Sequence, residues 1–225
     1  MGRKIPMKTV SRTRKCVGCL ALTTVLLVVA DRYYPAVLDT LGIGTEMVAD
    51  RNAGLDIVSA ARSQIGVTVK YVPAYEPIKC PNGDVPRERG VCTDVLIRAL
   101  RDARSIDLQP LIYNDMKWHR WAYPLKSVFQ AVDSCIVHRR VLNMECYFRR
   151  RGWTVQSNKI GDFLPGDIVT CRVSGILPHV MIVSDKVNTN DEPFVIHYIG
   201  SGTKEDSYLF ANAVEGHFRC STVNQ

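Results

Sequence analysis

The first thirty residues contain no aspartate or glutamate, although they carry six of the 29 lysines and arginines of the chain. The remaining residues hold 23 basic side chains against 22 acidic ones, so nearly all of the net charge of +7 belongs to the N-terminal segment. A phosphate-binding surface needs its positive charge in the folded domain. The sequence therefore argues against nucleic-acid binding by the body of the protein.

The chain also lacks internal repeats and low-complexity tracts, and no CxxC or HxxxH spacing occurs after residue 30. Zinc sites usually draw their ligands from such spacings. We therefore expect neither a metal nor an organic cofactor. A length of 225 residues gives room for one well-buried domain and an N-terminal address segment.

An apolar run over residues 17–30 follows the basic stretch, and it is short for a bilayer span of about 20 residues. This layout is typical of a secretory signal, and Val28 and Ala30 fit a small-residue cleavage site before Asp31. An uncleaved anchor in the inner membrane is the alternative. Either one predicts export of the body to the periplasm or cell envelope. We expect the signal or anchor over 1–30, a tether over 31–50 and the folded domain over 51–225.

Hydrophobic periodicity predicts helices in the first part of the domain and strands in the last third. The expected helices span 52–66, 91–104, 121–132 and 139–151. The expected strands span 67–71, 167–172, 179–184, 194–199 and 216–220. Helices followed by clustered strands predict an α+β domain, with helices packed on one side of an antiparallel sheet.

Cys92 is the strongest candidate for chemistry, because a glycine-containing loop brings it to the first turn of a predicted helix. Free backbone N–H groups and the helix dipole at that end favour a thiolate, and they can also stabilise an oxyanion. Two structural roles stay open for Cys92. It could be a buried apolar cysteine, or it could form a disulfide, for instance with Cys80.

Two histidines on successive predicted strands complete a candidate catalytic group. His179 begins one strand, and its imidazole is suited to act as the general base for Cys92. His197 lies on the next strand and can orient His179 if the two strands pair. His119, His138 and His217 fit surface, capping or structural roles better.

Three further residues are candidates for substrate or oxyanion contacts. Tyr71, upstream of Cys92, could donate a hydrogen bond to an oxyanion. Asp94 could contact substrate or simply complement the dipole of its helix. Asp84 could do the same or be a plain turn residue in the Pro- and Gly-rich segment 73–90. Whether that segment forms a lid stays open.

Several short motifs, in order along the chain, carry a family resemblance. They are Tyr71-Val72-Pro73-Ala74-Tyr75, Gly83-Asp84-Val85-Pro86, Arg89-Gly90-Val91-Cys92-Thr93-Asp94-Val95, Asn114-Asp115-Met116, His138-Arg139-Arg140-Val141, Pro165-Gly166-Asp167-Ile168-Val169, Leu177-Pro178-His179 and His197-Tyr198-Ile199-Gly200. From about residue 52 to residue 220 the sequence resembles the bacterial DUF1287 family. That family is in turn similar to the NlpC/P60 papain-like cysteine peptidases.

This resemblance implies a papain-like fold with Cys92 as nucleophile, His179 as base, His197 as orienting residue and Tyr71 near the oxyanion. NlpC/P60 proteins usually have Asp-Cys-Ser-Gly at the nucleophile, and the different residues around Cys92 here bear on the substrate pocket. The resulting prediction is an exported thiol hydrolase that cleaves amide bonds in the cell envelope, with peptidoglycan stem peptides as substrate. The alternative is a non-catalytic module that binds an envelope ligand.

Overall fold

The computed structural model describes residues 54–124, 133–157 and 159–220. The chain divides into two compact units, Met1–Ala49 and Asp50–Gln225, and all described residues belong to the second. The predicted signal or anchor and the tether lie outside the described residues. None of the helices in the described part is long and apolar enough to cross a membrane.

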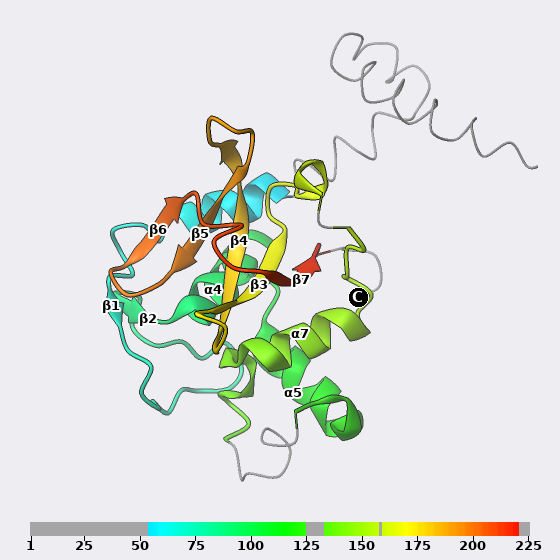
Figure 1. The fold of residues 1–225 in the computed structure, drawn as a ribbon. Helices are drawn as coiled ribbons and strands as arrows, with labels where there is room; N and C mark the ends of the chain where they lie inside the picture. Colours follow the sequence, from blue (N-terminus) through cyan, green and yellow to red (C-terminus); the bar gives the residue numbers. More distant parts are fainter. Residues whose placement is uncertain (1–53, 125–132, 158, 221–225) are drawn as a thin grey trace, which may run out of the picture. The chain divides into compact units, whose positions relative to one another are not determined.

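A five-stranded antiparallel sheet forms the centre of the domain, in the order β6-β5-β4-β3-β7 (Figure 1). Its strands are β3 (Ile168–Val173), β4 (Leu177–Val187), β5 (Pro193–Tyr198), β6 (Thr203–Asp206) and β7 (Val214–Phe218). The four strands predicted in this region are confirmed within a few residues. The charged strand β6, which pairs with β5 at the sheet edge, was not predicted.

The helices comprise residues 54–62, α4 (Cys92–Arg104), α5 (Leu108–Trp118) and α7 (Val141–Arg150). The described residues also form three short 3-10 helices: η1 (Arg120–Ala122), η2 (Val137–Arg139) and η3 (Ile160–Asp162). The predicted helices 52–66, 91–104 and 139–151 match the first, second and fourth helices, whereas α5 was not predicted. Of the predicted helix 121–132, only the start lies in η1, and residues 125–132 are outside the described part. The α+β class is confirmed.

The two faces of the sheet have different cores. Along β4, Val180 and Ile182 point into the larger core, which the helices cover, as Figure 1 shows for α4 behind the sheet. Met181 and Val183 point to the opposite face, into a smaller cluster closed by loop residues such as Phe163. Because side chains alternate along a strand, each residue of β4 belongs to one face or the other.

The predicted strand 67–71 is wrong for its first three residues. Only Lys70–Tyr71 (β1) is extended and paired, in parallel with β2 (Arg89–Gly90). Val67 and Val69 alternate with polar residues in sequence, but both side chains are exposed. A longer strand here would therefore gain no stability from packing against the core.

The segment that leads to Cys92 is held to the domain at several points. Cys80 forms a disulfide with Cys135, which excludes the alternative of a Cys80–Cys92 pair. Arg98 of α4 is 1% exposed, and its guanidinium pairs with both carboxylate oxygens of Asp84 at 2.8 and 2.9 Å. It also donates to the carbonyl oxygens of Val85 and Arg89. These contacts anchor residues 80–90 to α4, which does not fit a lid in this part of the segment.

Candidate functional site

Cys92 is the first residue of α4, and the residue is 8% exposed. The backbone N–H groups of Val180 on β4, Thr93 and Cys92 lie near the sulfur, and each of them lowers the pKa of the thiol. The thiol therefore lies against the peptide unit that joins Val180 to His179. Cys92 is a free cysteine in the structure.

A divergence between β4 and β5 makes room for this contact. The register of the two strands includes Ile182↔Ile196 and Val183↔Val195, but it does not extend to residues 179–181 of β4. The N–H of Val183 donates to Asp167 on the β3 side. Because donors alternate along an antiparallel strand, the N–H of Val180 points toward β5. Val180 lies beyond the residues of β4 that pair with β5, and its N–H is near the sulfur of Cys92.

The helix N-terminus does not by itself give Cys92 a thiolate. Burial raises the pKa of the thiol to about 11, and the charge of Asp94 adds to the increase. The hydrogen bonds from the three backbone N–H groups lower the pKa, but burial outweighs them. The expected stabilisation of a thiolate is thus not realised in this conformation, in which the thiol is neutral at pH 7.

His179 and His197 form the hydrogen bond that strand pairing was expected to allow. Nε2 of His179 lies 3.0 Å from Nδ1 of His197, and both rings are buried. Nε2 of His197 lies 2.9 Å from a carboxylate oxygen of Asp206 on β6. The ring of His197 also stacks on Tyr208, with centroids 4.7 Å apart.

This chain of contacts fixes the protons on both rings. The carboxylate of Asp206 can only accept, so Nε2 of His197 carries the proton and Nδ1 of His197 is left as an acceptor. Nε2 of His179 must then donate to it. The remaining nitrogen of His179, Nδ1, therefore carries the free lone pair, which is the property that a general base needs.

His179 is a neutral imidazole in this state. Burial lowers its pKa to about 3, and the neighbouring His197 and Lys204 lower it further, because a proton on His179 would be repelled by a proton on His197 and by the Lys204 ammonium. By its place in β4, His179 shares the sheet face of Met181, whereas Cys92 starts the helix on the other face. No hydrogen bond joins the sulfur of Cys92 to the ring of His179 in the described part of the chain. The thiol therefore lies near the backbone next to His179, while the imidazole lies on the opposite face of the sheet.

Tyr71 lies close enough to Cys92 for the two groups to influence each other's charge. Burial raises the pKa of the Tyr71 hydroxyl, and negative charge at Cys92 and Asp94 raises it further. Its ring packs edge-on against Tyr198, with centroids 5.2 Å apart, while 44% of the residue stays exposed. Pairing with Gly90 in the small parallel ladder holds it there. Tyr71 is thus near enough to Cys92 for an electrostatic effect and is also partly exposed to solvent.

The carboxylates of Asp94 and Asp84 form hydrogen bonds and ion pairs within the protein. Asp94 is 2% exposed, accepts from the backbone N–H of Val91 at 2.7 Å, and forms a two-bonded pair with Arg139 at 2.8 Å. Asp84 pairs with Arg98 as described above. Both arrangements favour a role in holding the start of α4 over direct contact with substrate.

The other histidines lie outside this group. His217 bonds Asp167 at 2.8 Å within the protein, and His119 contacts Asp115 at the end of α5. His138 is 1% exposed, its Nδ1 has no partner, and burial lowers its pKa to about 4.

Sequence reasoning missed Asp206 and the N–H of Val180. A charged strand at a sheet edge has no hydrophobic alternation to reveal it, and the freed N–H depends on where β5 diverges. With the register known, Asp206 is recognisable. Lys204 pairs with His197, so Asp206, two residues further on, lies diagonal to His197 on the same face.

The described residues contain no group of three or more His, Cys, Asp or Glu side chains that could hold a metal ion. A groove of about 410 Å³ lies at the other end of α4. Its lining includes Ile106, Leu111, Tyr147 and Trp153, and no residue of the Cys92 group contributes to it.

Comparison with known proteins shows which family the chain belongs to. The family model described as "Domain of unknown function (DUF1287)" matches residues 58–220. The chain belongs to this family. It is 45% identical over 169 residues to "Uncharacterized protein YijF" of Escherichia coli (strain K12), which covers 75% of this chain and 82% of that protein. No solved structure matches the chain.

Proposed function

We propose that this DUF1287 protein is an exported cysteine hydrolase that cleaves amide bonds in the bacterial cell envelope. Peptidoglycan stem peptides are the proposed substrate. The observation that carries the proposal is the hydrogen-bond chain from Asp206 through His197 to His179. This chain leaves the free lone pair of His179 on Nδ1, and the backbone N–H of the neighbouring residue, Val180, lies near the thiol of Cys92.

The reaction begins when the proton of the Cys92 thiol passes to Nδ1 of His179. The thiolate attacks the amide carbonyl and forms a tetrahedral intermediate. His179 then gives its proton to the leaving amine, and a thioester on Cys92 remains. Water attacks the thioester as His179 takes one of its protons, and that proton returns to the sulfur when the carboxylic acid leaves. No metal or organic cofactor takes part in the proposal.

The groups around the sulfur suit the negative charge that develops. The backbone N–H groups at the start of α4 can donate to an oxyanion that forms beside Cys92. The hydroxyl of Tyr71, which reaches solvent at the same place, is the side-chain donor in this proposal. Substrate must also bring Nδ1 of His179 and the sulfur into contact, because they share no hydrogen bond before it binds.

Two further features support an envelope hydrolase with a papain-like arrangement. The Cys80–Cys135 disulfide is typical of proteins in an oxidising compartment, and the basic, then apolar N-terminal sequence is typical of export. The nucleophile at a helix start, the base near the start of a strand and the polar partner on the next strand follow the NlpC/P60 order. The periplasm or cell envelope is therefore the proposed location, with inner-membrane association through residues 17–30 if they are not removed.

The burial of the group favours a second candidate, a non-catalytic module that binds an envelope ligand. Cys92 is 8% exposed, His179 is 4% exposed, and their pKa values leave both neutral. A closed, uncharged pair of this kind also suits a hydrolase-like fold that holds a ligand without cleaving it.

Incubation of the full chain with soluble peptidoglycan fragments, followed by mass spectrometry, separates the two candidates. A hydrolase yields products with one new amino and one new carboxyl terminus, and Cys92→Ala and His179→Gln abolish them. Cys171→Ser is the matched control, since Cys171 is buried and free but faces the smaller core. Fragments that bind with no cleavage at any pH would identify a binding module. Cleavage that survives in Cys92→Ala would exclude this mechanism.

A further inference from the structure

A surface at the end of α5 exposes two tryptophans to solvent. Trp118, the last residue of α5, is 75% exposed, and Trp121, in η1, is 82% exposed. Tryptophan is highly buried on average, so two such side chains within four positions form an unusual surface. Leu111 and Tyr113 of the same helix are also exposed.

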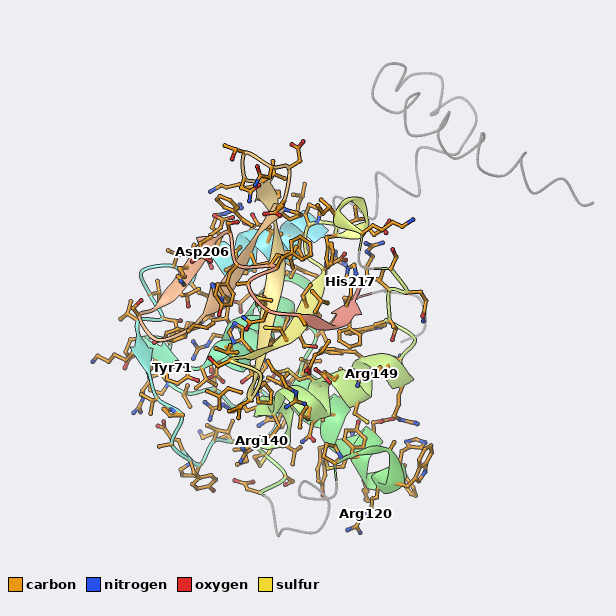
Figure 2. All side chains as sticks on the ribbon, in the orientation of Figure 1. Tyr71, Arg120, Arg140, Arg149, Asp206 and His217 are labelled. Carbon is orange, nitrogen blue, oxygen red and sulfur yellow. A yellow bond between two sulfur atoms is a disulfide. The ribbon has the colours of Figure 1, made fainter. Side chains whose placement is uncertain are left out.

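The charge around these tryptophans is mostly positive. Residues 116–124 contain no aspartate or glutamate, and the end of α7 adds a run of three arginines. Lys117 and Arg150 lie over the two tryptophans, Arg120 precedes Trp121 in sequence, and Arg149 and Arg151 flank Arg150. Two carboxylates lie among them, and both are largely buried and already paired, Asp115 with Arg150 and Glu145 with Arg149. Figure 2 labels Arg120 beyond the end of α5 and Arg149 on α7. The exposed charge therefore complements an anionic partner.

The basic side chains also lie over the indole rings. The Lys117 ammonium is 5.6 Å from the ring centroid of Trp118, and the Arg150 guanidinium is 5.9 Å from that of Trp121. Each pair thus presents an amphipathic ring and a cation together. Tryptophan and basic residues gather in the same way at the headgroup level of bilayers, where the ring sits among glycerol groups and the cation meets lipid phosphate.

We propose that the Trp118–Trp121 surface docks on an anionic phospholipid bilayer. The two indoles enter the interface, and Lys117 and Arg150, which lie over them, face the lipid phosphates. The proposal concerns the folded domain itself and does not depend on the hydrolase reaction or on residues 17–30. It would hold the domain against a membrane face after any removal of the N-terminal segment.

The native fluorescence of the full chain tests the proposal directly. The chain has three tryptophans, and the third, Trp153, is 7% exposed in the core, so a change on lipid contact reports on the surface pair. The full chain is mixed with vesicles of phosphatidylglycerol and phosphatidylcholine, or of phosphatidylcholine alone, each with brominated acyl chains as quenchers. The N-terminal segment can attach the chain to either vesicle, but it contains no tryptophan.

We expect a blue shift and quenching with the anionic vesicles and little change with the neutral ones. Trp118→Phe with Trp121→Phe should remove the response and leave the emission of Trp153. Lys117→Glu should reduce docking by at least about fivefold, in line with the contribution of one cation near an anionic surface. Lys159→Glu, a charge reversal at an exposed lysine outside this surface, should leave docking unchanged.

Equal quenching by both vesicles, or by neither, would overturn the proposal. A shift that depends on protein concentration without lipid would assign the surface to a second copy of the chain. A shift caused by soluble peptidoglycan fragments but not by vesicles would assign it to the substrate. Cleavage of soluble fragments is measured separately, so failure of docking and failure of the hydrolase proposal can be told apart.

Discussion

The side chain of Asp206 determines which nitrogen of His179 is basic, although it lies two hydrogen bonds away from that nitrogen. If His197 lost its carboxylate partner, its own tautomer would no longer be fixed, and it could present a proton to His179 in place of a lone pair. Asp206 is thus a positioning residue in the proposed reaction. Its contact with Lys204 at 2.7 Å holds the carboxylate near His197.

Replacement of Asp206 should therefore lower kcat for peptide cleavage with little change in KM. We expect about a tenfold or larger loss for Asp206→Ala, and a loss of about 10²–10⁴-fold for His179→Ala, which removes the base itself. Asp206→Asn should recover part of the rate, because its amide oxygen can still accept from His197. Steady-state kinetics over a pH series checks this. An equal loss in the Ala and Asn variants, or a change in KM alone, would argue against the positioning role.

Two buried neutral histidines should make the fold sensitive to mild acid. The folded-state pKa is lowered to about 3 for His179 and to about 4 for His138, whereas the unfolded value is near 6.5. Below pH 6.5 the unfolded chain therefore binds protons that the folded chain does not, and the free energy of unfolding falls. We expect a loss of about 1–2 kcal/mol per histidine between pH 7 and pH 5.

Urea unfolding at the two pH values, monitored by circular dichroism, measures this loss. His138→Gln should show a smaller drop between pH 7 and pH 5 than the unmodified chain, even if it is less stable at both. His119→Gln is the control, because His119 is partly exposed at the end of α5. The same drop in the His138→Gln variant as in the unmodified chain would show that His138 is not held neutral.

At the scale of elements, the sequence predicted those whose hydrophobic pattern matches their packing. The apolar stripe of α4 and the β-rich runs of β3, β4 and β5 all face a core, so periodicity located them. Helix α5 escaped detection because Pro110 lies in its first turn, where the missing N–H costs nothing, and Asp107 caps the helix from outside. Strand β6 has the sequence TKED, which offers no apolar alternation.

The candidate site also has residues that the sequence predicted and properties that it did not. Cys92, His179 and His197 could be found because each occupies a recognisable place at the start of a helix or on a strand. The pKa of the Cys92 thiol could not be predicted from the sequence, because it depends on how deeply other segments bury the sulfur. Asp84 looked like a loop residue because nothing in the sequence shows that Arg98 is buried beneath it.

Arg98 is the residue that connects α4 to the loop before Cys92, so its loss should destabilise the domain. Arg98→Met keeps much of the volume but leaves the carbonyl oxygens of Val85 and Arg89 without their donor. We expect a loss of about 2–4 kcal/mol in the free energy of unfolding. Arg87→Met should cost less than about 1 kcal/mol, because its pair with Asp102 is half-exposed. Chemical denaturation of both variants compares them, and equal losses would contradict this role.

For the whole molecule, the Cys80–Cys135 disulfide connects two distant parts of the domain. It closes a loop across 55 residues of sequence separation that contains α4 and α5. Restricting an unfolded loop of this length is worth about 4 kcal/mol in the chain-entropy model. The bond therefore supports the helical layer that carries Cys92.

Cys80→Ser with Cys135→Ser should lower the free energy of unfolding by about 2–4 kcal/mol. Reducing agent should lower the stability of the unmodified chain by a similar amount and leave the double variant unchanged. Thermal denaturation with and without reductant makes the comparison. A reductant effect that persists in the double variant would locate the stabilising bond elsewhere.

The burial of Cys92 has a consequence for its survival at the proposed location in the cell envelope. Oxidants and foreign disulfides attack thiolates that they can reach, and an exposed, low-pKa thiol would soon become a sulfenic acid or a mixed disulfide. Cys92 is held protonated and covered, with its sulfur against the backbone of β4. At the proposed location, burial would protect the thiol from oxidants until a ligand rearranges its surroundings, and no reductase would be needed to regenerate it.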